Sequence, residues 1–374
     1  MLIRNLCILL VVLALAAGNV LGAVTTTFTA VTGDWSNSSN WDISEPIAGD
    51  TAIIDANNTA LITQDGEVCA ILKVGSNLGG PGYVEMSGGT LYASSYIGIG
   101  YQGCDGTFIQ SGGTNNGKTI YLDRSLAGAP ASNAYYRLDG GTLDVDSFYL
   151  GYLSEATGTA ILDVNAPNLT LTFHTLFSIS PVGEYYAEPN TTMYMDSCNF
   201  GTIYPVQAEH MTGLQNTKLV YDSTNGAATS QLEALGDDIG PVMEGFIPGN
   251  MKIRQVDIGG SGFMGGIRVV NLQVHGDENI QDAVYVETLN ITAGSTLDME
   301  AGGHINVYYN YGTIDPSAII VGPDHLIQVP YSEHYCLESP EHDLNGDCVI
   351  DFGDFATLAA GWLECGFYLP ADCL

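Results

Sequence analysis

A motif that repeats between residues 82 and 172 limits the possible fold of this chain more than any other feature. Each copy ends in a Gly-Gly-Thr triplet, and the first glycines of three triplets, 24 and then 28 residues apart, are Gly88, Gly112 and Gly140. A short β-type run follows each triplet, at residues 95–100, 119–122 and 147–151. Repeats this short, without helical periodicity, cannot each bury an apolar face, so they stack and share a core. The motif therefore predicts a β-solenoid.

We expect the solenoid to be a right-handed parallel β-helix, because parallel crossovers are nearly always right-handed. A twisted antiparallel sandwich is the alternative. More strands separated by Gly, Asn and Asp turns are predicted at residues 219–221, 251–258, 266–274, 283–291 and 304–309. Residues 236–249, with two prolines, read as an excursion from the stack. The fold class is thus all-β, with a small α-helical calcium-binding module at the C-terminal end.

That module is predicted from residues 343–354, which have the ligand spacing of an EF-hand-type calcium loop. Oxygen ligands fall at loop positions 1, 3, 5, 7, 9 and 12, with a backbone carbonyl at position 7; the residues are Asp343, Asn345, Asp347, Val349, Asp351 and Asp354. An apolar stripe at helical spacing follows, formed by Phe355, Leu358, Ala359, Trp362 and Leu363. The expected cofactor is one calcium ion, and a solvated acidic turn is the alternative.

The loop and helix resemble one repeat of a dockerin type I module over about the last forty residues. The resemblance implies a cohesin-like or cell-surface partner. Two departures matter: position 6 of the loop is Cys348 instead of glycine, and the chain has one repeat where a dockerin has two. The apolar stripe is therefore expected to pack on its own cysteine-rich segment.

Residues 1–22 read as a secretory signal peptide, because Arg4 precedes an apolar run that is too short to span a membrane. The chain is expected to be secreted or displayed at the cell surface, without a membrane span. Its formal net charge of −33 is expected to repel nucleic acid, anionic membranes and polyanionic sugars. The same charge, with both ends of the solenoid covered, predicts a monomer.

Cysteines are unevenly distributed along the chain. Four of them, Cys336, Cys348, Cys365 and Cys373, lie in or near the calcium loop, where disulfides are expected in an oxidising compartment and zinc ligation is the alternative. The other three, after the signal peptide, are Cys69, Cys104 and Cys198. Because three is an odd number, at least one thiol is expected to be free or buried.

The segment around Trp35 and Trp41 resembles the opening of secreted bacterial β-helix proteins related to autotransporter passengers. The tryptophans are expected to cap the open end of the solenoid; stacking on sugar rings is the alternative. At the other end, residues 311–335 carry three prolines and are expected to cover the last turn instead of extending it.

Parallel β-helices also include pectate-lyase-like polysaccharidases, but no catalytic residue can be assigned. Asp144 and Asp146 share one strand face and could bind a cation or act as acid and base. The histidines, His174, His210, His275, His304, His325, His334 and His342, show no zinc-hydrolase spacing.

Four regions are therefore expected: a signal peptide (1–22), a cap with solenoid repeats (23–210), further turns with an excursion (211–330) and a cysteine-rich calcium module (331–374). The leading hypothesis is an exported non-catalytic β-solenoid used for attachment or assembly. The alternative is a polysaccharide-degrading or polysaccharide-binding protein that uses the flank of the solenoid.

Overall fold

The computed structural model describes residues 23–76, 79–124, 130–152, 158–202, 208–223, 229–260, 264–270, 282–301, 303–308 and 312–329. These residues belong to two compact units that divide after Asp163. The predicted signal peptide and the predicted calcium module lie outside the described residues.

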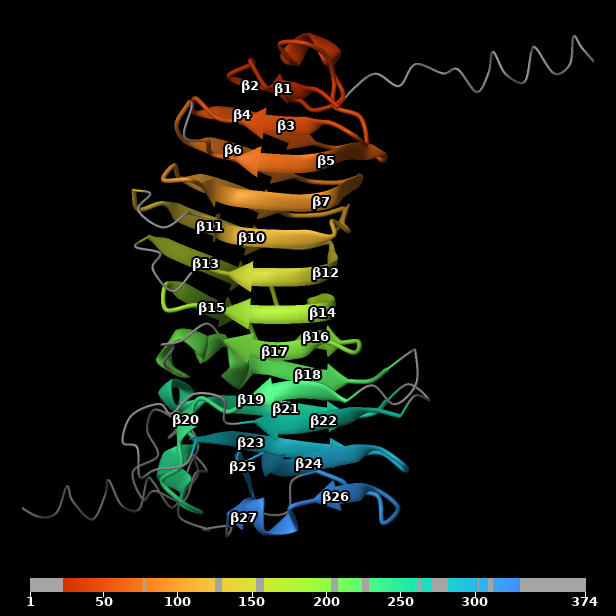
Figure 1. Cartoon of the computed structure of the whole chain (residues 1–374), viewed down its shortest axis with the longest axis vertical. Helices are drawn as coiled ribbons and strands as arrows, with labels where there is room; N and C mark the ends of the chain where they lie inside the picture. Colours follow the sequence, from red (N-terminus) through yellow and green to blue (C-terminus); the bar gives the residue numbers. More distant parts are fainter. Residues whose placement is uncertain are drawn as a thin grey trace, which may run out of the picture. The chain divides into compact units, whose positions relative to one another are not determined.

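The first unit consists of short strands joined by turns (Figure 1). Its strands are β1 (Thr25–Thr27), β2 (Thr32–Asp34), β3 (Thr51–Ile54), β4 (Asn58–Ile62), β5 (Glu67–Val74), β6 (Gly82–Met86), β7 (Thr90–Tyr101), β8 (Gly106–Gln110), β9 (Thr114–Asn115), β10 (Thr119–Arg124), β11 (Asn133–Leu138), β12 (Thr142–Leu150) and β13 (Thr159–Val164). A 3-10 turn, η1 (Ser38–Asn40), separates β2 from β3.

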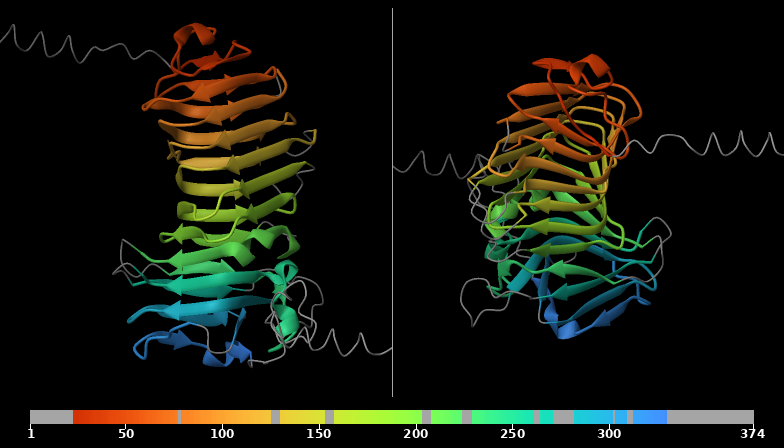
Figure 2. Two further views of the ribbon diagram at one scale, coloured as in Figure 1. Left: turned by 180° about the vertical axis from the view of Figure 1, so that it is seen from behind. Right: turned by 45° about the horizontal axis from the view of Figure 1, so that its top comes forward.

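The strands of this unit pair in parallel with strands one turn away along the chain. One ladder runs β1–β3–β5–β7–β10–β12, and a second runs β2–β4–β6–β8–β11. Figures 1 and 2 show these strands as successive stacked turns. The predicted parallel β-solenoid is confirmed, and the antiparallel sandwich is wrong. The right-handed winding stays a prediction.

The Gly-Gly-Thr triplets set the register of the stack. Thr90 pairs with Thr114, and Thr114 pairs with Thr142, so equivalent residues of three repeats lie directly over one another. The second glycine of the middle triplet, Gly113, has φ +73°, and a Cβ there would lie 2.5 Å from the carbonyl oxygen of Gly89. Only glycine fits both the backbone conformation and the close approach of the next turn.

The core of this unit is built from alternate residues of each strand, as strand geometry requires. In the second ladder, Val84, Phe108 and Tyr136 occupy equivalent buried positions of neighbouring turns. The rings of Phe108 and Tyr136 are stacked, with centroids 4.9 Å apart. Buried side chains of successive turns therefore lie over one another and form a core that the turns share.

The two tryptophans lie inside the first turn. Trp35 is fully buried and Trp41 nearly so, and their rings make an edge contact at 4.9 Å. The indole Nε1 of Trp41 donates to the carbonyl oxygen of Trp35 at 2.8 Å. Because both rings are enclosed, neither is available to stack on a sugar.

The second unit continues with strands and short 3-10 turns. Its strands are β14 (Thr170–Ile179), β15 (Gly183–Ala187), β16 (Thr191–Met195), β17 (Asn199–Thr202), β18 (Thr217–Tyr221), β19 (Ser230–Glu233), β20 (Gly236–Asp237), β21 (Lys252–Ile258), β22 (Gly266–Val270), β23 (Asp282–Ile291), β24 (Thr296–Ala301), β25 (His304–Tyr308), β26 (Ile319–Val321) and β27 (Leu326–Val329). The 3-10 turns are η2 (Ala208–Asn216), η3 (Met243–Gly245), η4 (Pro248–Asn250) and η5 (Pro323–His325).

This unit has two parallel ladders of its own. One runs β14–β16–β18–β21–β23–β25–β27, and the other runs β14–β17–β19–β22–β24–β26. Residues 311–335 were expected to cover the last turn. This expectation is wrong for β26 (319–321) and β27 (326–329), which extend the two ladders. Pro316 lies in a turn and Pro323 begins η5, so neither removes a hydrogen bond from a strand.

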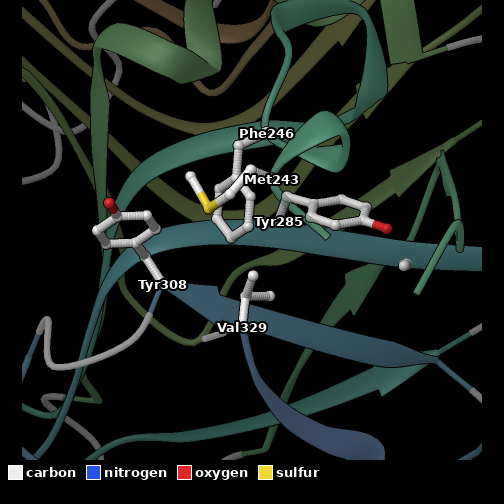
Figure 3. Close-up of a cluster of buried hydrophobic side chains, with 6 residues drawn as sticks. Met243, Phe246, Tyr285, Tyr308 and Val329 are labelled. Atoms are coloured by element: carbon white, nitrogen blue, oxygen red, sulfur yellow. The ribbon is translucent and has the colours of Figure 1, made fainter. Parts of the chain in front are cut away.

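Residues 236–250 leave the parallel arrangement. They contain β20, which pairs antiparallel with β23, and the turns η3 and η4. Met243 and Phe246 pack back on Ala283, Tyr285, Tyr308 and Val329, which forms a buried apolar cluster (Figure 3). This cluster attaches the excursion to the ladder that it leaves.

Cys69, Cys104 and Cys198 are all free thiols. Cys69 and Cys198 are fully buried, and burial raises the pKa of each thiol to about 12. Both are therefore protonated and unreactive at neutral pH. The four cysteines predicted to form disulfides lie outside the described residues.

Candidate functional site

The predicted calcium ligands, Asp343, Asn345, Asp347, Val349, Asp351 and Asp354, lie outside the described residues. Calcium binding therefore stays a prediction. Within the described ranges, no group of three or more His, Cys, Asp or Glu side chains could hold a metal ion.

The sequence also singled out Asp144, Asp146 and the histidines. Both aspartates lie on the outer face of β12, as the alternation predicts, and no feature of the structure assigns them an acid–base role. His174 pairs with Asp196 at 3.2 Å, and His210 contacts the carbonyl oxygen of Gly183 at 3.0 Å. His275, His334 and His342 lie outside the described residues.

His304 and His325 come together in the second unit, although they are distant in sequence. Their ring centroids are 4.6 Å apart. The Nδ1 atom of His304 pairs with Asp238 at 2.5 Å, and that of His325 contacts the carbonyl oxygen of Met299 at 3.0 Å. The parallel pairing of Ile305 with Leu326 brings the two histidines together, and Asp238 of the excursion joins them.

A larger group of aromatic and cationic side chains covers part of the outer face of β5, β7, β10 and β12, which are neighbours in Figure 1. We call it the tyrosine–arginine surface, and it consists of Lys73, Tyr96, Tyr101, Tyr121, Arg124, Tyr149 and Tyr152. Each of these side chains is half-buried. All belong to the first unit.

The register of the strands places these residues in columns across the turns. Tyr121 is paired with Tyr149 on one side and with Gly98 on the other. Gly98 has no side chain, and a Cβ there would lie 3.2 Å from the ring of Tyr101 and 3.6 Å from that of Tyr96. The rings of Tyr96 and Tyr101 therefore lie close to the space that a side chain at this position would occupy.

A left-handed residue at the end of β10 brings Arg124 to this surface. In β10, Ile120 and Leu122 point inward and Tyr121 outward, so strict alternation would turn Arg124 toward the core. Asp123 has φ +50° and is buried, which reverses the alternation and leaves Arg124 on the face of Tyr121. A non-glycine residue in this conformation is unusual and is often found where a side chain must be placed for function.

The same bend recurs in the neighbouring turns. Gly100 has φ +68° and Gly151 has φ +81°, at the positions aligned with Asp123. The residues that follow the three bends are Tyr101, Arg124 and Tyr152, and Tyr101 pairs directly with Arg124. The guanidinium thus lies between two tyrosines of adjacent turns.

The guanidinium of Arg124 lies over the tyrosine rings. Its Cζ atom is 4.0 Å from the ring centre of Tyr96 and 4.7 Å from that of Tyr121. Tyr152 and Tyr101 are somewhat farther away, at 5.6 and 5.9 Å. Such cation–π contacts contribute about 0.5 to 2 kcal/mol each, depending on desolvation.

The rings also contact one another. Tyr121 and Tyr149 are stacked with centroids 4.8 Å apart, close to the spacing of adjacent strands. Tyr152 makes an edge contact with Tyr121 at 4.9 Å, and Tyr96 does so at 5.7 Å. These contacts hold the rings in fixed orientations, so the surface is formed before any ligand arrives.

Partial burial raises the pKa values of these tyrosines. The pKa of Tyr96 is raised to about 12 by burial, against the lowering effect of Arg124. Burial also raises the pKa values of Tyr121 and Tyr149. The other groups that shift these three pKa values are Arg124 and neighbouring tyrosines, and no carboxylate is among them.

This surface differs from the surroundings of four other cations among the described residues. An ion pair with a carboxylate, at 2.5 to 2.8 Å, is made by each of Arg137, Lys218, Lys252 and Arg268. In the part of the chain that the structure describes, Arg124 and Lys73 instead lie over tyrosine rings. Although the protein has 42 acidic residues, two cations on one small area make no ion pair with a carboxylate among the described residues.

Sequence reasoning did not find this surface. The sequence pattern predicts the β-type runs but not that their last residues lie side by side. The segments 97–101, 120–124 and 148–152 nevertheless end in Tyr, Arg and Tyr at equivalent positions. An alignment of the repeats that includes one more residue at the end of each run places Tyr101, Arg124 and Tyr152 in one column. Such an alignment still predicts that the side chain of Arg124 points inward, because the left-handed conformation of Asp123 cannot be recognised from the sequence.

An open hollow in the second unit, of about 280 Å³, is a different kind of site. It is lined by Glu184, Tyr186, Glu209 and His210. The hydroxyl of Tyr186 donates to Glu184 at 2.6 Å. Glycoside hydrolysis uses a pair of carboxylates as acid and base or nucleophile, so the two carboxylates of this hollow are of the type that a polysaccharide-degrading enzyme needs.

Comparisons with protein-family models, with curated proteins and with solved structures gave no match for this chain. Among the described residues, no helix has both the length and the apolar character to cross a membrane.

Proposed function

We propose that the chain is an exported, non-catalytic β-solenoid protein that binds a polysaccharide at the tyrosine–arginine surface. The observation that carries the proposal is the fixed arrangement of Tyr96, Tyr121 and Tyr149 on three adjacent turns. Tyr121 stacks on Tyr149 and lies under Arg124, so the C–H groups of a sugar would pack along the outer edges of the rings, and the tyrosine hydroxyls would supply hydrogen bonds. Successive strands are about 4.8 Å apart, which is similar to the length of one sugar ring, so a sugar chain along the stack would meet one turn after another.

The C-terminal calcium module completes this proposal. A dockerin-like segment with one bound calcium would attach the solenoid to a cohesin-like or cell-surface partner, and the solenoid would hold the polysaccharide. The signal peptide would direct the protein out of the cell, where such ligands occur.

The test is affinity electrophoresis of the purified full chain through gels that contain plant, algal or bacterial polysaccharides. We expect retardation by at least one polysaccharide. Replacing both Tyr121 and Tyr149 with alanine should weaken binding about tenfold or more, because each lost ring contact is worth about 1 kcal/mol. Tyr92→Ala is the matched control, since Tyr92 is exposed on β7 but is outside the surface. Equal retardation of all variants, or none for the wild type, would contradict the proposal.

The hollow at Glu184 and Glu209 favours a polysaccharide-degrading function as the second candidate. The same polysaccharides should then be assayed for new reducing ends. Turnover that disappears in Glu209→Gln would establish this candidate and would show that the non-catalytic assignment is wrong.

A further inference from the structure

The cations of the tyrosine–arginine surface distinguish it from a purely aromatic sugar-binding platform. The rings cover the faces of the Arg124 guanidinium, which lies 4.0 Å from the centre of Tyr96. The N–H donors of a guanidinium lie in its plane, so they remain at the edge of the group. A guanidinium has five such donors, and those at its edge can reach a ligand.

A second cation extends the positive area. Lys73 lies 4.4 Å from the ring centre of Tyr101 and is two turns away from Arg124 along the stack. Neither cation makes an ion pair within the described residues, whereas Lys218, Lys252 and Arg268 do. In a chain of net charge −33, an arginine that makes no ion pair with a described carboxylate is available to an anion from outside.

We infer that the tyrosine–arginine surface takes an acidic sugar residue, whose ring packs on the tyrosines and whose carboxylate or sulfate group binds Arg124. This inference rests on the proposed function and names its ligand class. The planar fork of arginine matches a carboxylate or a sulfate with two parallel hydrogen bonds. Partial burial among tyrosines lowers the local dielectric constant and strengthens the contact.

The acidity of the rest of the chain does not prevent this contact. At physiological ionic strength the Debye length is about 8 Å, so carboxylates farther away are largely screened. Arg124 would contact the ligand directly, and the residues around it are tyrosines. Long-range repulsion would slow the approach of a long polyanion, whereas the bound contact would depend on Arg124.

Isothermal titration of the full chain at about 150 mM salt tests the inference with an oligogalacturonate, a sulfated oligogalactan and an uncharged oligomannan of equal length. We expect one acidic oligosaccharide to bind at least about tenfold more tightly than the uncharged one. Arg124→Gln should remove this preference, and Arg124→Lys should restore only part of it because the fork is lost. Lys118→Gln removes the same charge from an exposed residue just before β10 and should leave the preference unchanged.

The outcomes separate the inference from the proposed function. Equal affinity for acidic and uncharged oligosaccharides would overturn the inference. The inference would also be overturned if Arg124→Gln lowered the affinity for the acidic and the uncharged oligosaccharides by the same factor. Binding of the uncharged ligand would then still support the proposed function. An absence of binding to all three oligosaccharides and to every polysaccharide in the gels would refute both.

Discussion

At the scale of single residues, the fold keeps a few polar groups in surroundings that change their chemistry. Glu67 in β5 is only 3% exposed, and it hydrogen bonds to Glu45 close to Asp34. Burial, followed by the neighbouring charges of Glu45 and Asp34, raises the pKa of Glu67 from 4.5 to about 7. This carboxyl is therefore protonated in the fold over a pH range in which it would be ionised in the unfolded chain.

The raised pKa of Glu67 predicts a pH-dependent stability. Because the folded state binds this proton more tightly, the contribution of Glu67 is complete below about pH 4.5 and is lost as the pH rises to about 7. The loss is at most about 3 kcal/mol. Glu67→Gln keeps a hydrogen-bond donor without the charge, so urea unfolding should show it to be more stable than the wild type at pH 8, with a smaller difference at pH 5.

Glu85→Gln is the control for this prediction, because Glu85 is exposed on β6. Its free energy of unfolding should follow that of the wild type at both pH values. If Glu67→Gln behaves in the same way as Glu85→Gln, the buried carboxyl has no role in the pH dependence.

At the scale of single elements, the turns determine how closely the strands of neighbouring repeats stack. Gly113 and Gly141 both have positive φ, and a Cβ at either residue would lie within 2.5 Å of the carbonyl oxygen of the turn before it. The Gly-Gly-Thr triplet is thus required by the spacing between turns as well as by the bend itself.

Gly113→Ala should lower the free energy of unfolding by about 2 to 4 kcal/mol, because left-handed strain adds to a steric clash. Gly66→Ala separates the two effects, since Gly66 has φ +94° but its Cβ would meet no atom within 4 Å. That variant should cost only about 1 to 2 kcal/mol. Urea unfolding of both variants measures the difference, and equal costs would mean that stacking does not require a glycine.

At the scale of the whole molecule, two expectations remain predictions: a monomeric state and a calcium module at residues 331–374. For the module, titration calorimetry of the full chain should find one calcium site that magnesium fills poorly, because magnesium requires compact octahedral geometry. Asp347→Ala should abolish the binding heat, whereas Asp372→Ala, which removes a carboxylate outside the loop, should not. No calcium uptake by the oxidised protein would exclude the EF-hand-type loop.

The amino-acid sequence by itself determined the solenoid. The triplets at Gly88, Gly112 and Gly140 predicted the register in which Thr90, Thr114 and Thr142 stack, and the β-type runs became β7, β10 and β12. These features are local and repeated, so the same short-range preferences act at every turn.

Only the tertiary structure decided which side chains meet on the surface. Arg124 reaches the tyrosines because Asp123 is left-handed, and alternation alone would have pointed the arginine inward. His304 and His325 meet, and residues 319–329 extend the ladders, because of how distant segments return to the stack. Such contacts join residues that are a full turn or more apart in the chain, and no local pattern encodes which atoms will then be neighbours.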